Sequence, residues 1–249
     1  MDSWRDNIKE IVVEMTGADE NNHYYRTPLV AYARGDDPLF AEIVRVVGPV
    51  HLKPEEILPE VKTVISFYLP FSAEVVKSNQ GDGPVSRVWG LSYLAANTLI
   101  NSISEKLIER LSYLGYKTGT VPATYGFDAE TLKACWSHRS AAFVAGLGRF
   151  GLNRMLIGPA GGTGRYGTVF TEAEIPASER PTDDLCIYFK NGKCKVCLKA
   201  CPVEAVSEDG FDGQKCYAHV LKNSDYLDLD GRLCDVCGKC AVSGPCAMY

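Results

Sequence analysis

Apolar residues recur at helical spacing in two long stretches of the chain. In residues 4–16, four apolar residues fall on one side of a helix. In residues 86–114, apolar residues recur mostly every three or four positions, and Gly115 stands where a helix-ending glycine is expected. The pattern predicts two amphipathic helices, of which the second is the longest in the chain.

Shorter elements are predicted around these helices. We expect short helices from Asp37 to Val46 and from Pro54 onward, where proline occupies an early helical position. A further helix is expected over residues 129–145. Runs rich in β-branched and aromatic residues predict strands over residues 61–69, 117–122 and 166–170.

A glycine-rich stretch follows the helix expected over residues 129–145. Gly146-x-Gly148-x-x-Gly151 has the spacing of a dinucleotide-binding fingerprint, but that fingerprint needs a strand before it and a helix after it. Here a helix precedes and a strand follows, so we do not predict nucleotide binding. The glycines instead allow the backbone to approach closely either packed neighbours or a flat ligand.

The chemistry-bearing residues concentrate near the end of the sequence. Nine of the ten cysteines lie between Cys186 and Cys246. One run, residues 194–202, supplies the last three cysteines and the proline of the bacterial ferredoxin pattern C-x2-C-x2-C-x3-C-P. Asn191 stands at the position of the first cysteine, and Cys186 is its natural substitute. A second run, C-x2-C-x2-C, covers residues 234–240.

This spacing suits iron–sulfur cubes, each of which needs four thiolates at its corners. A tight turn lets neighbouring sulfurs reach adjacent irons, and Pro202 fits just past the last ligand because its φ is fixed and it lacks an amide hydrogen. Eight thiolates would hold two [4Fe–4S] clusters. Zinc is a rival, because separated C-x2-C pairs also describe zinc sites, and a disulfide framework is a weaker one, typical of small secreted domains.

Composition narrows the class of protein. The chain has 249 residues and a net charge of −5, enough for one large domain or a core with an appendage, and no basic stripe suggests nucleic acid. No apolar run reaches the roughly 18 residues of a membrane span, and the first residues are too polar for a signal peptide. Reduced thiols require a reducing compartment, so we expect a cytoplasmic protein that does not contact membranes.

At this point the sequence resembles a known family. Residues 144–153 (VAGLGRFGLN), residues 165–171 (RYGTVFT) and the C-x2-C-x3-C-P run are similar to epoxyqueuosine reductase and the respiratory reductive dehalogenases. The resemblance covers roughly residues 37–246. It fits best a branch of short relatives that lack the C-terminal helical-repeat extension of epoxyqueuosine reductase.

The resemblance implies an α/β (α+β) fold in two domains. Residues 1–180 would form a sandwich core of the nitroreductase-like, corrinoid-binding type, and residues 181–249 a ferredoxin-like module with two [4Fe–4S] clusters. Electrons would enter through a distal cluster, pass to a proximal one and reduce the cobalt of a base-off cobalamin.

The resemblance also implies two sets of cluster ligands. Set one comprises Cys201, Cys216, Cys237 and Cys240. Set two comprises Cys186, Cys194, Cys197 and Cys246. The two runs exchange their fourth ligands, as in two-cluster ferredoxins. Cys234 is left over, so the choice among it, Cys237 and Cys240 stays open, and Cys135 is expected to be a buried core thiol.

Further site residues are carried over from the same resemblance. The corrinoid is expected at glycines and neighbouring side chains: Gly146, Gly148, Arg149, Phe150, Asn153, Gly161, Gly162 and Gly164. Four side chains are alternative proton donors: Asp128, Tyr125, His138 and Arg139. A purely structural interpretation stands beside these roles, since Asp128 suits a helix N-cap and His138 and Arg139 suit a solvated helix face.

Three functions stay open on the sequence alone. The first is a reductase in which two clusters feed a corrinoid, or another bound redox centre, that acts on a small organic substrate. The second is a two-cluster electron carrier without corrinoid, and the third is a protein that reduces or handles corrinoid. Expected partners are an electron donor such as ferredoxin or flavodoxin and a small-molecule substrate. Epoxyqueuosine in tRNA is not expected as a substrate, because the acidic charge balance offers no substitute for phosphate contacts.

Overall fold

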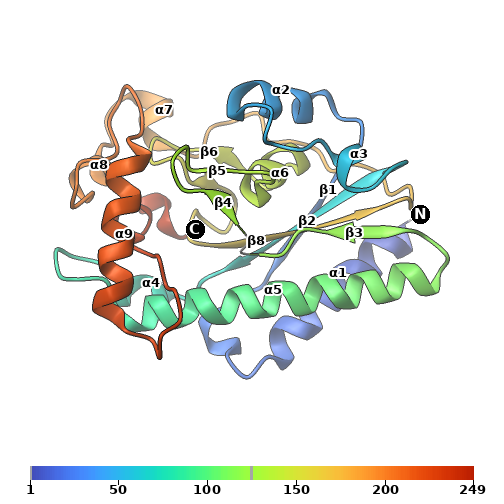
Figure 1. Ribbon diagram of the computed structural model, residues 1–249, viewed down its shortest axis with the longest axis horizontal. Coiled ribbons are helices and arrows are strands. Elements are labelled where there is room, and N and C mark those ends of the chain that lie inside the picture. The colour runs from blue at the N-terminus through green and yellow to red at the C-terminus, as the bar shows by residue number, and fades with distance from the viewer. Residues whose placement is uncertain (1, 124–125) are drawn as a thin grey trace.

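The computed structural model describes residues 2–123 and 126–249. Its centre is a four-stranded antiparallel sheet in the order β1-β2-β8-β3 (Figure 1). The strands cover Leu29–Arg34 (β1), Thr63–Pro70 (β2), Thr118–Thr120 (β3) and Gly164–Thr171 (β8). The three predicted strand regions are confirmed as β2, β3 and β8.

Strand β2 is buried along its whole length because helices cover both faces of the sheet. Its residues alternate between two hydrophobic clusters: Ile65, Phe67 and Leu69 enter one, and Val64 and Tyr68 enter the other. A strand covered on both faces needs a nearly continuous apolar run. The run VISFYL provides it, which is why the sequence predicts this strand clearly.

Two long helices, α1 (Asp2–Ala18) and α5 (Arg87–Tyr113), cover one face of the sheet (Figure 1). Apolar side chains of both helices join the cluster formed by one face of β2. Ser86 caps α5 by accepting a hydrogen bond from the backbone N–H of Val88, and Gly115 adopts a φ of 89° just beyond the helix. Both predicted amphipathic helices are confirmed. In the described part of the chain, none of the helices combines the length and apolar character needed to cross a membrane.

The opposite face of the sheet is covered by α6 (His138–Ala145), with α2 (Pro38–Val47) packed against it. The short helix α3 (Pro54–Ile57) follows α2 along the chain, and both predicted short helices are confirmed. The Trp136 ring packs between Phe40 of α2 and Phe170 of β8, with centroid distances of 5.9 and 4.9 Å. The result is an α/β sandwich of three layers, and the predicted fold class is confirmed.

Two predictions about elements need correction. Strand β1 is absent from the sequence prediction because its two alanines weaken the strand signal. The predicted helix over residues 129–145 is wrong in its first half, where a hairpin of β4 (Phe127–Asp128) and β5 (Lys133–Ala134) forms instead. Leu132 adopts a φ of 56° there, which no right-handed helix can contain.

Asp128 therefore does not start a helix. Its Oδ1 accepts hydrogen bonds from the backbone N–H groups of Glu130 and Thr131, at 3.1 and 2.6 Å, and so closes the turn of the β4–β5 hairpin. This is the local capping chemistry that the sequence suggested, but it serves a turn and not a helix.

The C-terminal module consists of short helices around the cysteines: α7 (Ile187–Asn191), α8 (Val196–Lys199), α9 (Gly213–Leu227), α10 (Lys239–Val242) and the 3-10 turn η2 (Pro245–Ala247). The remaining elements are the 3-10 turn η1 (Asn22–Tyr24), α4 (Ala73–Ser78), β6 (Arg149–Phe150) and β7 (Leu156–Ile157). A helix precedes the glycine-rich stretch and strands follow it, as predicted.

The module packs on the first turns of α5. A Cβ atom at Gly90 would lie 2.9 Å from Leu227 and 3.2 Å from Sγ of Cys234, so only glycine lets the module approach this closely. Trp89, beside it, packs against the backbone of Gly238, whose φ is 73°. Core and module thus share one hydrophobic cluster.

We predict that Gly238→Ala destabilises the protein more than Gly192→Ala. Both glycines have a φ of 73°, so both alanines suffer the same left-handed strain, but only at Gly238 would the new Cβ overlap the Trp89 ring. We expect an additional loss of about 1–3 kcal/mol in the free energy of unfolding for Gly238→Ala. Thermal unfolding of the two variants measures it, and equal midpoints would contradict this account of the module's packing.

Candidate functional site

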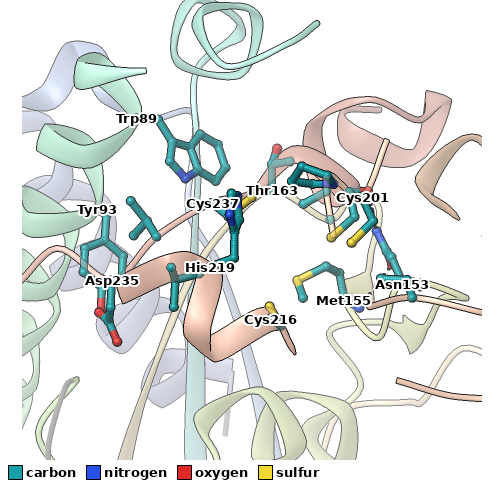
Figure 2. Close-up of a pocket in the computed structure, with 18 of the residues that line it drawn as sticks. Trp89, Tyr93, Asn153, Met155, Thr163, Cys201, Cys216, His219, Asp235 and Cys237 are labelled. Carbon is teal, nitrogen blue, oxygen red and sulfur yellow. Dashed lines mark hydrogen bonds between the residues drawn. The ribbon is translucent and has the colours of Figure 1, made fainter. Parts of the chain in front are cut away.

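A cavity of about 260 Å³ lies where the sandwich core meets the cysteine module (Figure 2). Trp89 and Tyr93 from α5 line it on the core side, together with the turn that leads into β8. All four cysteines of set one line it on the module side. The cavity therefore places the thiols of set one beside side chains of the core.

The thiols of set one lie close enough together to affect one another electrostatically. Burial, with smaller contributions from the neighbouring Cys237 and Cys201, raises the pKa of Cys216 to about 11. Burial raises the pKa of Cys240 to about 12, again with Cys237 and Cys201 as the next causes. These four cysteines come from three separate segments of the module, which the fold brings to one place.

The thiols of set two form a second group. Burial raises the pKa of Cys197, followed by the effects of Cys186 and Cys194. Burial also raises the pKa of Cys246 to about 11, followed by the effects of Cys186 and Cys197. Cys197 of set two also slightly raises the pKa of Cys240 of set one, so the two sets adjoin. Binding of a metal must displace the protons of these thiols, and should therefore strengthen as the pH rises.

The donor groups fit iron–sulfur cubes through their chemistry. Within residues 2–123 and 126–249, no three His, Cys, Asp or Glu side chains converge closely enough to hold a single metal ion. A cube differs from a single ion because each thiolate binds a different iron, so its four sulfurs surround a larger group. Two adjoining sets of four cysteines, each buried or half-buried, have the composition that two such cubes need.

The two remaining cysteines lie apart from these sets. Cys234 is fully buried between α9 and α5, with its Sγ 3.5 Å from the backbone oxygen of Gly90. Burial and then Asp235 raise the pKa of Cys234 to about 11, with no other cysteine among the causes. Cys135, expected to be a buried core thiol, is only half-buried; it directly follows β5, and its backbone oxygen accepts a hydrogen bond from Leu52.

Several hydrogen bonds reach the sulfur atoms of set one. The backbone N–H of Ala205 donates to Sγ of Cys201 at 3.2 Å. Asn223 and the backbone N–H of Lys239 lower the pKa of Cys237 by hydrogen bonding, although burial is the larger effect and raises it. Hydrogen bonds to sulfur favour the thiolate and help to set the reduction potential of a bound cluster.

Of the four predicted proton donors, only Arg139 lines the cavity. Burial lowers the pKa of its guanidinium group, while Tyr166 and Cys240 favour its charge. Asp128 is exposed in the hairpin, and Tyr125 lies outside the described residues. His138 is engaged elsewhere: Nε2 donates to the backbone oxygen of Pro122 at 3.2 Å, and Nδ1 accepts from Thr168 Oγ1 at 2.8 Å.

The residues predicted to bind corrinoid are divided between the cavity and packing contacts elsewhere in the protein. Asn153, Gly162 and Gly164 line the cavity, and the Asn153 amide donates to the backbone oxygen of Cys240 at 3.0 Å. Gly146 and Gly161 pack against other backbone segments, where an added Cβ would lie 2.6 Å from Glu179 and 2.5 Å from Ala247.

The other three predicted corrinoid positions also contact protein. Gly148 packs against the backbone of Ile157. Arg149 donates to Asp184 at 2.7 Å, and Phe150 packs on the Phe143 ring with a centroid distance of 5.5 Å. Through these contacts, the glycine-rich stretch holds the core together and fixes the linker that leads into the module.

Sequence reasoning missed the cavity residues of α5 and β8. Trp89, Tyr93 and Asn97 follow one another at i, i+4 spacing, so they share a side of the longest helix. The Arg165 guanidinium lies 4.4 Å from the centre of the Tyr93 ring and donates to Asn97 Oδ1 at 2.7 Å. His219 of α9 also faces the cavity (Figure 2). The sequence did carry a signal for this cavity, namely the aromatic residues Trp89 and Tyr93 near the start of the longest helix.

Comparison with known proteins gives a consistent set of relatives. No family model matches the chain. Epoxyqueuosine reductase of Synechococcus sp. (strain RCC307) is 29% identical over 191 residues, which cover 74% of this chain and 55% of that protein. Epoxyqueuosine reductase of Listeria monocytogenes is 29% identical over 216 residues, covering 80% and 52%. The chain thus spans about half the length of the curated relatives it matches.

Solved structures show the same fold. Epoxyqueuosine reductase from Bacillus subtilis superimposes with a TM-score of 0.57 at 17% identity, covering 96% of this chain and 65% of that one. A catabolic reductive dehalogenase superimposes with a TM-score of 0.59 at 16% identity, covering 85% and 28%. An α/β sandwich joined to a cysteine-rich module defines the class. The chain is similar in sequence to epoxyqueuosine reductases and shares its fold with them and with a reductive dehalogenase, the resemblance that its sequence motifs predicted.

We predict that His138 makes folding sensitive to mild acid. Burial lowers the pKa of His138 from 6.5 to about 4, so between these values the unfolded chain binds a proton that the folded chain does not. The free energy of unfolding should therefore fall as the pH drops from 6.5 towards 4, by at most about 1.4 kcal/mol per pH unit from this group. In His138→Gln this contribution should vanish. Urea unfolding across that range tests it, and identical pH slopes would contradict it.

Proposed function

We propose that the protein is an iron–sulfur reductase in which two [4Fe–4S] clusters deliver electrons to a small organic substrate in the cavity beside set one. The observation that carries the proposal is that all four thiols of set one line this cavity, while set two adjoins set one. The names of the curated relatives, which are all epoxyqueuosine reductase, support a reductive function.

Each set would hold one cluster. Set one would carry the proximal cluster, next to the cavity, and set two the distal cluster. Bound clusters would accept and donate single electrons. The chain's part is to hold the clusters near each other, keep water from them and tune their potentials through burial and hydrogen bonds to sulfur.

The cavity wall suits a small, mainly apolar substrate that gains negative charge on reduction. Trp89, Phe71 and Met155 supply apolar surface. Arg139 and Arg165 lie near each other, and neither forms an ion pair with a carboxylate in the described part of the chain. Unpaired guanidinium groups in a half-buried site would stabilise negative charge as electrons arrive. Tyr93 and His219 bring exchangeable protons to the same wall.

A corrinoid does not fit the cavity as the structure describes it. Pockets for drug-sized ligands measure about 300–1,000 Å³, and a corrinoid is larger than such ligands. The cavity of about 260 Å³ must also accommodate a cluster on set one. Six of the eight residues predicted to bind corrinoid are in close contacts within the protein, among them Gly164, where an added Cβ would overlap the backbone oxygen of Leu69. The proposed reaction therefore passes electrons from the proximal cluster directly to the substrate.

We predict about eight irons per chain after anaerobic reconstitution. Cys240→Ser should lose roughly half of this iron, because it removes a ligand of one cluster only. Cys234→Ser is the matched control, because Cys234 belongs to the same C-x2-C-x2-C run as Cys240 but faces α5. Iron analysis with visible and electron paramagnetic resonance spectra measures both variants. Bound zinc, or equal iron loss from both variants, would refute the ligand assignment.

Cobalamin provides a second test of the proposal. We predict that titration of the reconstituted protein with cobalamin leaves the visible spectrum of the corrinoid in its base-on form, because the cavity is too small to admit it. Conversion to the base-off form would show that core and module separate to admit the cofactor, and would favour a corrinoid-dependent reductase or a corrinoid-handling protein instead.

A further inference from the structure

The segment around set two carries an unusual concentration of positive charge. Residues 185–203 contain four lysines and no acidic residue, although the whole chain has a net charge of −5. The segment forms α7, the loop before Cys194, and α8. It lies at the end of the molecule far from the N-terminus (Figure 1).

Most of this charge is unpaired and exposed. Lys190 and Lys193 are exposed, and neither takes part in an ion pair or hydrogen-bonds through its side chain within residues 2–123 and 126–249. Lys195 is the exception, because it pairs with Glu208 at 2.5 Å. The free positive charge therefore lies beside Cys194, the half-buried first cysteine of the C-x2-C-x3-C run.

Apolar side chains accompany the lysines. Phe189 and Val196 are 47% and 40% exposed, on either side of the loop that holds Lys193. We call Phe189, Lys190, Lys193 and Val196 the α7–α8 face. Exposed aromatic surface bordered by charge is typical of protein-binding patches, in which apolar contacts provide affinity and charges guide the encounter.

We propose that the α7–α8 face is the docking surface for an acidic one-electron carrier protein. The proposal rests on the proposed function, because it needs a cluster on set two. In the reaction the carrier loses one electron, the distal cluster gains it, and no bond or proton changes place. Docking at this face places the carrier next to Cys194 of set two. Electrons would continue from set two through set one to the cavity.

The chemistry of the face favours a protein partner over a nucleic acid. Its cations are lysines, whereas phosphate recognition favours the bidentate geometry of arginine. Lys190 and Lys193, the two cations of the face, are fewer than the phosphate contacts of most nucleic-acid sites.

The experiment compares two double variants of the reconstituted full-length protein. Lys190→Glu/Lys193→Glu reverses the charge of the α7–α8 face. Lys9→Glu/Lys62→Glu makes the same change in net charge at two exposed lysines of the core. Stopped-flow absorbance follows reduction of the clusters by a reduced acidic ferredoxin at low and at physiological salt, and by dithionite as a small chemical reductant.

We expect Lys190→Glu/Lys193→Glu to slow reduction by ferredoxin by about tenfold or more at low salt and to weaken its salt dependence. The Lys9→Glu/Lys62→Glu rate should stay within about twofold of the wild-type rate, and dithionite should reduce all three proteins equally. Equal ferredoxin rates for the two double variants would overturn the proposal, and so would tRNA binding that is lost only in Lys190→Glu/Lys193→Glu. Failure of the wild-type protein to bind iron would instead refute the proposed function, which the iron analysis detects separately.

Discussion

The packing of the cysteine module on the first turns of α5 is the constraint on which the rest of the structure depends. It requires the absence of a side chain at Gly90 and the left-handed backbone of Gly238 beneath the Trp89 ring. Because α5 is also the longest helix of the core, the same element fixes the sheet on one side and the thiols on the other. The position of the cavity follows, since its walls are the surfaces that this packing leaves unfilled.

Electrostatics adds a second condition. A cluster on set one would place the negative charge of four thiolates at the boundary between core and module. Arg139 and Arg165 are positioned there without carboxylate partners, and Lys239 is buried beside Cys237 with its Nζ donating to the backbone oxygens of Asn79 and Gly81. These cations would offset charge that burial alone disfavours, which accounts for the two arginines in the lining of a largely apolar cavity.

The sequence was most informative where one physical signal dominated. Continuous apolar residues predict β2, and helical spacing predicts α1 and α5. Cysteine spacing indicates iron–sulfur clusters, whereas the division into two ligand sets with Cys234 left over comes from the family resemblance and stays a prediction. It failed where short elements depend on tertiary contacts: β1 contains two alanines, and the β4–β5 hairpin is fixed by the side chain of Asp128 and the positive φ of Leu132. The cavity could not be predicted, because Trp89, Arg139 and His219 meet only after three separate segments have folded together.

The C-terminal turn is attached to the core. This attachment fixes the order in which the core folds and set two would be completed. Cys246 belongs to a turn whose backbone oxygens accept hydrogen bonds from Gly162 and Thr163, and Arg26 donates to Phe71, Ala160 and Tyr249 across the same junction. These partners are far apart along the chain, so they meet late in folding. The four thiols of set two would therefore come together only on a chain whose core had already formed, so that folding of the core would precede completion of set two.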